Sequence, residues 1–275
     1  MSNFRIAGVQ MDVMLAGKQA NLDAMQHWLR QTTAEGARLT VFPECALTGY
    51  CFDSLEEAIP YAESVPGPAT KTVAEWCREL NAFVVFGLLE RDGERLFNAC
   101  ALVGPEGVIG NYRKIHLPYL GVDRFTTLGD QPFAVHQAGP VRVGMNICYD
   151  GAFPESSRVM ALDRADLIVL PTNWPPGAEC TADYVINTRA MENHVYYLAV
   201  DRVGVERGFS FIGKSRLCAP NGDSLASADH TDPAVLYGDL DLERVRDKKV
   251  VRVPGKHEIH RFDDRRPEMY KRLSE

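Results

Sequence analysis

The sequence predicts an α/β fold built around mixed β-sheets. Short apolar runs of strand length alternate along the chain with amphipathic stretches of helical period, which is the order typical of β-α crossovers. The run at 83–89 is apolar almost throughout, as in a strand that is covered on both faces. Turn sequences at 91–93, 104–107 and 220–223 join neighbouring runs as hairpins. The sheets are therefore expected to contain antiparallel as well as parallel pairs.

In the first half of the chain, the apolar pattern predicts strands and helices in turn. Leu22, Met25 and Leu29 share one face of the first helix. Pro68 precedes the second helix, where a proline loses no intrahelical hydrogen bond. The expected strands cover 4–9, 39–42, 83–89, 96–103 and 108–112, and the expected helices cover 20–32 and 69–80.

The second half of the chain is organised around a strand expected at 141–147. Apolar residues occupy alternate positions of this stretch, which is the period of a strand with one buried face. Pro154 and Glu155 then suit the first turn of a helix. Further strands are expected at 167–170, 196–200, 213–218 and 224–228, and helices at 154–162 and 182–193.

The composition is that of a globular protein. The chain has 275 residues, of which 45% are hydrophobic and 24% are charged, and no linker divides it, so residues 1–275 are expected to form a single domain. The net charge is −7, and no basic run suggests binding to nucleic acid or to a membrane surface. No apolar stretch approaches the roughly 20 residues that span a bilayer, and we expect a cytoplasmic location.

The seven cysteines are scattered, and no Cys-x-x-Cys or His-x-x-His spacing suggests zinc binding. An odd number without a secretory leader indicates reduced thiols and no structural disulfide framework. We expect no bound metal. The cysteines are Cys45, Cys51, Cys77, Cys100, Cys148, Cys180 and Cys218.

Three of the expected strands end at a residue that is reactive in hydrolysis. Glu44, Lys114 and Cys148 follow strands in three different parts of the chain. Because open α/β sheets bind ligands at the carboxyl ends of their strands, we expect the three side chains to meet. A carboxylate, an ammonium and a thiol together form a hydrolytic set.

Cys148 occupies an expected turn between a strand and a helix. The unpaired backbone N–H groups of such a turn are expected to lower the thiol pKa and to stabilise an oxyanion. The alternative is that Cys148 is a small buried hydrophobic residue, which is the commoner role of a free cysteine. Glu44 and Lys114 at the other strand ends favour the nucleophile.

The substrate pocket is expected to be formed by the loops that leave these strand ends, at 50–53, 119–125 and 173–177. The first of these loops is rich in aromatic and polar residues, so it either lines the pocket or packs inside the protein. The aromatic candidates are Tyr50, Phe52, Tyr119, Phe125 and Trp174, and the charged candidates are Asp53, Asp123 and Arg124.

These motifs resemble those of the nitrilase, or carbon–nitrogen hydrolase, superfamily. The similarity spans nearly the whole chain in the order that this family shows. The motifs are Phe42-Pro43-Glu44 with Leu47-Thr48-Gly49-Tyr50 for the glutamate, Tyr112-Arg113-Lys114-Ile115-His116-Leu117 for the lysine, Ile147-Cys148-Tyr149-Asp150 with Phe153-Pro154-Glu155 for the cysteine, and the segments 171–174, 189–193, 213–215 and 220–222.

The resemblance implies a four-layer α-β-β-α sandwich. It also implies that Cys148 attacks the carbonyl carbon of an amide, with Glu44 as general base and then as acid. Lys114 and the backbone N–H of Tyr149 would stabilise the oxyanion. Neither a metal nor an organic cofactor is required. The residues expected to contact the substrate are Tyr149, Tyr50, Asp123, Asn173 and Trp174.

The chain departs from the family at one position. Many members carry a second glutamate after the lysine motif, where it orients the substrate and the lysine, but the segment 118–125 contains no glutamate. Asp123 is the carboxylate available there. It either replaces the glutamate or forms a surface ion pair with Arg124.

Two further pairs have simple interpretations. His116 could replace Glu44 as the base, but it stands two positions from Lys114, and on a strand the two side chains would share a face and compete for space. We therefore expect His116 to support the site rather than to act in it. Arg189 and Glu192 have the spacing of an ion pair on one helix face.

The residues after the cysteine resemble those of amidases and ω-amidases, whereas true nitrilases tend to have Cys-Trp-Glu. The leading interpretation is hydrolysis of a small linear amide to a carboxylate and ammonia. The alternatives are an N-carbamoyl hydrolase, which would use the same residues, and a non-catalytic binding or regulatory member of the family.

The tail at 248–275 is too polar to form a core, yet it is rich in arginine and aromatic residues. It must lie over the domain, cross to a partner or be mobile. The resemblance implies that the sandwich pairs with a second copy, and we expect the tail to pack across the interface of a homodimer or of a higher homo-oligomer.

Overall fold

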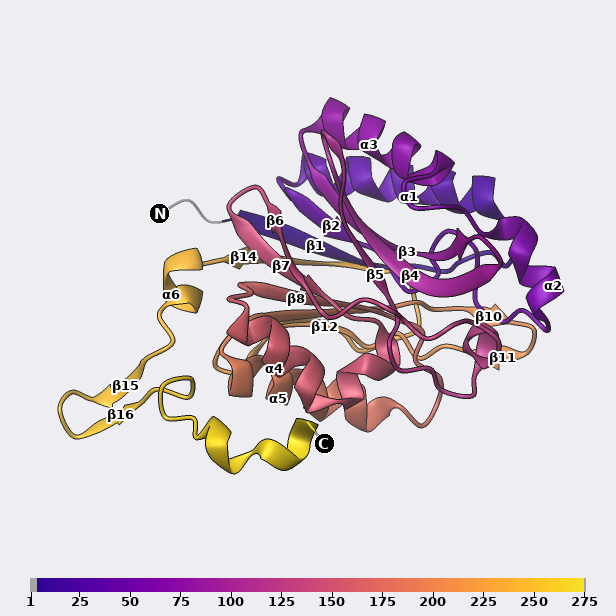
Figure 1. Ribbon diagram of the computed structural model, residues 1–275. Coiled ribbons are helices and arrows are strands. Elements are labelled where there is room, and N and C mark those ends of the chain that lie inside the picture. The colour runs from indigo at the N-terminus through magenta and orange to yellow at the C-terminus, as the bar shows by residue number, and fades with distance from the viewer. Residues whose placement is uncertain (1–3, 275) are drawn as a thin grey trace.

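The computed structural model describes residues 4–274 and has four layers in the order α-β-β-α (Figure 1). Helices α1 (Lys18–Ala34) and α3 (Pro68–Leu80) cover the outer face of one six-stranded sheet. Helices α4 (Pro154–Leu162) and α5 (Ile186–Asn193) cover the outer face of a second six-stranded sheet. The predicted sandwich with mixed sheets is confirmed.

The first sheet has the strand order β14-β1-β2-β3-β4-β5. Strands β1, β2 and β3 are parallel, β4 is antiparallel to β3, and β5 is antiparallel to β4. Strand β5 therefore runs in the direction of β2, and both end at the same edge. The strands are β1 (Phe4–Gln10), β2 (Leu39–Val41), β3 (Phe83–Asp92), β4 (Arg95–Gly104), β5 (Gly107–Arg113) and β14 (Ala234–Leu240).

The second sheet has the order β13-β12-β9-β8-β7-β6, with β7, β8 and β9 parallel and the outer pairs antiparallel. The predicted hairpin around 220–223 joins β12 to β13. The strands are β6 (Val135–Ala138), β7 (Val141–Met145), β8 (Leu167–Thr172), β9 (Tyr196–Asp201), β12 (Ser215–Cys218) and β13 (Ser224–Ala228).

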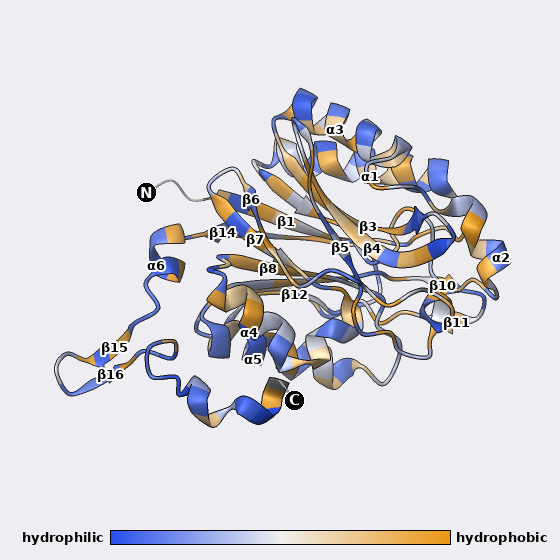
Figure 2. Cartoon of the chain, in the orientation of Figure 1, coloured by the Kyte–Doolittle hydropathy of each residue, from blue (hydrophilic) through white to orange (hydrophobic). Residues whose placement is uncertain are grey.

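Strand β3 shows how one strand serves two hydrophobic cores. Val84, Phe86 and Leu88 pack in the core beneath α1 and α3, whereas Val85 packs in the core between the two sheets. The alternation follows from the opposite directions of successive side chains on a strand. Figure 2 shows apolar residues concentrated along the strands, while the helices carry both apolar and hydrophilic residues.

The bounds of several elements differ from the prediction; strand β12, for example, begins at Ser215 and not at 213. Strand β7 ends at Met145, before the expected end at 147, because Ile147 N donates to Asp150 Oδ2 at 3.0 Å and so belongs to the following turn. The helix expected at 182–193 begins as a π-helical turn, Thr181–Val185, before α5.

Other elements were not predicted. Strand β14 pairs with β1 from Ala234 to Leu240, although its sequence has no strict apolar alternation.

None of the helices within residues 4–274 is long and apolar enough to cross a membrane. The remaining elements are α2 (Leu55–Ala58), β10 (Val205–Glu206), β11 (Phe209–Ser210), α6 (Leu242–Arg246), β15 (Val250–Val253), β16 (His257–Ile259), and 3-10 helices at Ile59–Tyr61, Gly121–Arg124, Cys148–Ala152, Pro267–Met269 and Lys271–Ser274.

Gly87 allows the turn after β2 to cross close to β3. A Cβ atom at this position would lie 2.3 Å from Cys45 N and 2.6 Å from Pro43 O. The turn is hydrogen-bonded to the same glycine, because Gly87 N donates to Pro43 O at 3.1 Å and Leu47 N donates to Gly87 O at 3.1 Å. The backbone on both sides of Glu44 is therefore fixed against the sheet.

We predict that Gly87→Ala lowers the free energy of unfolding by about 1–3 kcal/mol, the usual effect of overpacking. The measurement is urea denaturation, and Gly87→Val should cost more because it adds further atoms against the same backbone. The direction of the change tests the crowding. At an uncrowded position, replacing glycine by alanine stabilises a protein by about 0.4–1 kcal/mol, because it lowers the conformational entropy of the unfolded chain. A stabilised Gly87→Ala variant would contradict the crowding.

Candidate active site

Glu44, Lys114 and Cys148 meet where the two sheets expose their strand ends. Glu44 follows β2 and Lys114 follows β5 in the first sheet, whereas Cys148 follows β7 in the second. Their exposed fractions are 1%, 0% and 8%. The charges of Glu44 and Lys114 both act on the Cys148 thiol, so the sheets bring a base, a cation and a thiol into one site.

The Lys114 ammonium is held between two carboxylates. Its Nζ donates to Glu44 Oε1 at 2.7 Å and to Asp123 Oδ2 at 2.6 Å, and all three side chains are fully buried. Burial by itself lowers the pKa of Lys114, but the charges of Asp123 and Glu44 outweigh it and raise the pKa well above its ordinary value. The amine is therefore protonated, and one of its three N–H groups is not used by these carboxylates.

Asn98 and Tyr50 complete the hydrogen bonds of the two carboxylates. Asn98 Nδ2 donates to Glu44 Oε1 at 2.7 Å and to Asp123 Oδ1 at 2.8 Å. The Tyr50 hydroxyl donates to Asp123 Oδ2 at 2.8 Å and lies 3.0 Å from Leu120 O. Sequence reasoning missed Asn98, although it is the polar residue of the otherwise apolar run 96–103.

The second oxygen of Glu44 is free. Oε2 is buried and has no hydrogen-bond partner among the described residues. Burial raises the pKa of Glu44, Lys114 lowers it, and the charge of Asp123 raises it again, so that the net shift is upward. Glu44 therefore presents an unpaired oxygen with a stronger affinity for a proton than an ordinary carboxylate has.

The expectation of a lowered thiol pKa is wrong. Burial and the Glu44 charge raise the pKa of Cys148, and the Lys114 ammonium, the Thr172 hydroxyl and the Asn173 backbone N–H oppose this rise without cancelling it. The turn geometry itself is as expected, with Cys148 in the left-handed region at φ 44°. The resting site therefore holds a protonated thiol on a constrained backbone.

Arg189 supports this turn from α5. It forms the expected ion pair with Glu192, with Nη1 at 2.9 Å from Oε1. Its Nε also donates to Gly151 O at 3.2 Å and its Nη2 to Ala152 O at 3.1 Å. The Arg189 side chain therefore also attaches α5 to the turn that carries Cys148. In the same turn, Tyr149 is 42% exposed, and its ring meets the edge of Phe153 with centroids 5.1 Å apart.

His116 binds Asp150 rather than Glu44. The His116 Nδ1 atom lies 2.7 Å from Asp150 Oδ1, and the ring stacks on Phe153 with centroids 3.7 Å apart. Strand β5 ends at Arg113, so the argument that His116 and Lys114 share a strand face was wrong. His116 nevertheless supports the turn that carries Cys148, because Asp150 also accepts from Ile147 N.

Asp123 does not form a surface pair with Arg124. Its exposed fraction is 3%, and its partners are Lys114, Asn98 and Tyr50. The Arg124 guanidinium instead donates to Phe52 O at 2.9 Å. Asp123 therefore contacts the lysine, as the resemblance leads one to expect of the second glutamate.

Asn173 and Trp174 follow β8 beside Cys148. The Asn173 side chain is fully buried, and neither of its polar atoms has a partner among the described residues. Trp174 N donates to Asp201 Oδ1 at 2.7 Å, and the Trp174 side chain is 3% exposed. Burial raises the pKa of the Asp201 carboxyl well above its ordinary value.

The expected aromatic residues do not form one continuous wall. Tyr50 and Phe52 are buried in a small core beneath the site, whereas Tyr119 is 90% exposed. Parts of the loops 50–53 and 119–125 instead line a surface cavity of about 310 Å³, together with Glu206, Arg207 and Phe209.

Among the residues that the structure describes, no three His, Cys, Asp or Glu side chains are grouped as a metal site requires.

Comparison with known proteins agrees with this geometry. The family model for carbon-nitrogen hydrolases matches residues 5–250. A nitrilase of Pyrococcus abyssi is 38% identical over 267 residues, which cover 97% of this chain and 98% of that protein. The omega-amidase NIT2 of Homo sapiens is 30% identical over 262 residues, which cover 89% of this chain and 91% of that protein.

A solved structure shows the same fold. An amidase from Nesterenkonia sp. superposes with a TM-score of 0.81 at 24% sequence identity, covering 99% of this chain and 97% of that chain. The family match and the full-length relatives also confirm the resemblance to the nitrilase superfamily and support its amidase branch. The chain therefore belongs to the carbon–nitrogen hydrolase family.

Proposed function

We propose that this protein hydrolyses a small linear amide to a carboxylate and ammonia through a thioester on Cys148. The proposal rests mainly on the different surroundings of the two Glu44 carboxylate oxygens. Lys114 and Asn98 hold Oε1, while the buried Oε2 has no partner. Leaving a buried polar atom unpaired is costly, and such atoms point to a function. Here the function is to accept the proton of a thiol that does not ionise on its own.

In the first half-reaction, the Cys148 sulfur forms a bond to the amide carbonyl carbon while Glu44 takes the thiol proton. The carbonyl oxygen becomes an oxyanion, which the free N–H of Lys114 and the backbone N–H of Tyr149 stabilise. Losing one donor of this kind typically costs about 2.7–4 kcal/mol of transition-state stabilisation. The C–N bond then breaks, and Glu44 returns the proton to the departing nitrogen.

In the second half-reaction, Glu44 takes a proton from the water molecule that attacks the thioester carbon. The second tetrahedral intermediate collapses, the C–S bond breaks, and the proton returns to the sulfur. Asp123 and Asn98 keep Lys114 and Glu44 in place through both halves, and we assign to Asp123 the role of the family's second glutamate. The reaction therefore needs only water in addition to the amide.

The small size of the substrate follows from the burial of the site. Cys148 is 8% exposed, and the unpaired amide of Asn173 offers N–H donors and an acceptor oxygen to a polar substrate group. The related amidase from Nesterenkonia sp. has been crystallised with acrylamide and with butyramide. An N-carbamoyl compound presents its ureido carbonyl to the same residues and is the alternative substrate class.

We expect the protein to release ammonia from short primary amides and Cys148→Ala to release none, because the alanine cannot form the thioester. Ammonia is measured across linear amides of increasing length and across N-carbamoyl amines, with carbon dioxide measured in parallel. Cys180→Ala is the matched control, since Cys180 is an exposed cysteine that is not among the residues assigned to the reaction. Carbon dioxide release would favour the N-carbamoyl alternative. No product from either panel would favour a non-catalytic member.

The acid limb of kcat/KM is expected above the ordinary Glu pKa of 4.5, because Glu44 must be ionised to accept the thiol proton and burial raises its pKa. Activity is therefore lost as the pH falls through this raised value. Asp123→Asn removes a negative charge that raises the Glu44 pKa, so it should move the limb to lower pH as well as reduce the rate. An acid limb at or below pH 4.5 in the wild type, or a shift of the limb to higher pH in Asp123→Asn, would contradict the assignment of Glu44 as the base.

We also propose that residues 1–275 form a single hydrolase domain whose tail, 248–275, packs against a second copy. The hairpin β15–β16 projects from the sandwich (Figure 1), and its Val251 and Val253 are 48% and 46% exposed. Exposed apolar residues also occur on the outer helices, with Val159 and Leu162 of α4 at 41% and 39%. Apolar surface on both elements favours an interface.

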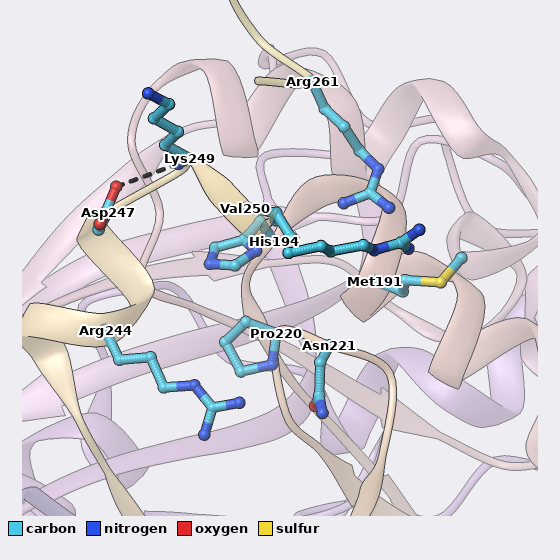
Figure 3. A pocket seen from close by; sticks show the side chains of 10 residues that line it. Met191, His194, Pro220, Asn221, Arg244, Asp247, Lys249, Val250 and Arg261 are labelled. Carbon is cyan, nitrogen blue, oxygen red and sulfur yellow. Dashed lines mark hydrogen bonds between the residues drawn. The ribbon is translucent and has the colours of Figure 1, made fainter. Parts of the chain in front are cut away.

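Charge at the junction between the tail and the body supports the same proposal. A pocket of about 410 Å³ separates them and is lined by His194, Arg244 and Arg261 (Figure 3). Neither arginine forms an ion pair within residues 4–274. Arg244 on the body side and Arg261 on the tail side face this pocket together with Asp247, so like charges stand on both of its sides.

The full chain is expected to be a dimer or a larger homo-oligomer in solution at micromolar concentration. Replacing both Val251 and Val253 by Asp should shift it toward the monomer, because burying unpaired carboxylates in an interface is costly. The mass is measured by light scattering, and Lys256→Gln at the exposed hairpin turn is the control. A monomeric wild-type protein would refute this assembly.

A further inference from the structure

An ion-pair cluster, in which Arg202 and Glu206 are buried and Asp12 is exposed, joins the two sheets outside the site described above. Arg202 follows β9 of the second sheet and is fully buried. Its Nη2 donates to Asp12 Oδ1 at 2.9 Å and to Val13 O at 2.6 Å, just beyond β1 of the first sheet. Its Nη1 donates to Glu206 Oε1 at 2.6 Å. We call Arg202, Asp12 and Glu206 the inter-sheet cluster.

Glu206 extends this cluster to the active site. Its Oε2 accepts hydrogen bonds from Tyr50 N at 2.9 Å and from Cys51 N at 2.5 Å. At the other end of the same residue, the Tyr50 hydroxyl donates to Asp123, which holds Lys114. A continuous series of hydrogen bonds therefore runs from Arg202 of the second sheet through Glu206, Tyr50 and Asp123 to Lys114.

The chain leaves room for the Glu206 carboxylate. Gly49 has φ 80°, which favours glycine, and a Cβ atom there would lie 2.8 Å from Glu206 Oε1 and 2.6 Å from Leu15 Cα. The loop before Tyr50 can therefore approach the carboxylate only with glycine at this position. Glu206 itself is 4% exposed, so it is not a surface residue that binds the loop by chance.

We propose that Glu206 is a positioning residue of the hydrolase reaction. Glu44 and Lys114 belong to the first sheet and Cys148 to the second, so the reaction depends on the placement of one sheet relative to the other. Glu206 belongs to a segment that leaves the second sheet, and it fixes the Tyr50 loop of the first sheet. It thereby sets the position of Lys114. Displacements of about 1 Å can cost a hundredfold in rate, so this contact matters for turnover.

The inference rests on the proposed function, and its first test is Glu206→Gln. Glutamine has the same size but only one oxygen, so its NH₂ group must face either Arg202 or the two backbone N–H groups. We expect kcat to fall about tenfold or more, with a KM change within about threefold. Glu57→Gln is the matched control, because Glu57 also accepts a backbone N–H and pairs with an arginine nearby, but has no contact with Tyr50. This control should keep kcat within about twofold of the wild type.

A double-mutant cycle separates positioning from simple stabilisation. Tyr50→Phe removes the hydroxyl contact to Asp123, so a Glu206→Gln change made on top of it should slow turnover by no more than about threefold. If Glu206 acts independently of Tyr50, the two losses multiply and the proposal fails. The proposal also fails if Glu206→Gln lowers the unfolding midpoint but leaves kcat unchanged. If Glu206→Gln does not fold, Glu206→Asp replaces it, since aspartate keeps the charge and shortens the reach.

A second measurement keeps this test independent of amide turnover. Iodoacetamide alkylates Cys148 by forming a C–S bond and releasing iodide, and Glu44 takes the thiol proton, so the rate reports the geometry of the site without any hydrolysis. Mass mapping should show slower labelling of Cys148 in Glu206→Gln, while exposed Cys180 is labelled at the wild-type rate. If the wild type hydrolyses no amide, the proposed function fails, but the labelling cycle still decides the role of Glu206. Equal Cys148 labelling in both proteins would overturn that role.

Discussion

A fully buried ammonium group requires negative charge at more than one position, and this requirement shapes the catalytic side of the protein. Lys114 obtains that charge from Glu44, in the turn after β2, and from Asp123, in a separate loop. Removing one partner of a buried ion pair typically costs about 3–5 kcal/mol, a large part of the about 5–15 kcal/mol that stabilises a domain. The charges that surround Lys114 therefore also hold two distant segments of the chain in place. The stability of the protein is thus coupled to the geometry of this site.

The sequence was most informative where structure is encoded locally. Apolar runs predict strands, and the residue types at their ends predict that Glu44, Lys114 and Cys148 lie at one edge. Hydrogen bonds between distant segments are not visible in such patterns. Tyr50 and Glu206 are 156 positions apart, and nothing in either neighbourhood indicates the other. Asn98 is visible in the sequence as a polar residue in an apolar run. Its hydrogen-bond partners cannot be predicted from that run, because they depend on which strands lie beside it in the sheet.

The thiol of Cys148 shows why a motif alone does not predict a pKa. The local turn suggests stabilisation of the thiolate, and the observed left-handed backbone agrees with such a turn. Burial is a property of the assembled layers, however, and it acts in the opposite direction together with the charge of Glu44. Burial and the Glu44 charge raise the pKa of Cys148 by more than the local contacts lower it. Ionisation of the sulfur is therefore tied to the base that the other sheet supplies.

The protonated thiol has a consequence for the durability of the protein. Hydrogen peroxide and other oxidants react with thiolates much faster than with thiols, and they attack exposed sulfur first. Burial protects Cys45, Cys77 and Cys100 in the same way, since it also raises their pKa values. Under the proposed function, the Cys148 sulfur becomes charged only when Glu44 takes its proton. Oxidative damage should therefore begin at exposed Cys180 and spare the buried sulfur of Cys148.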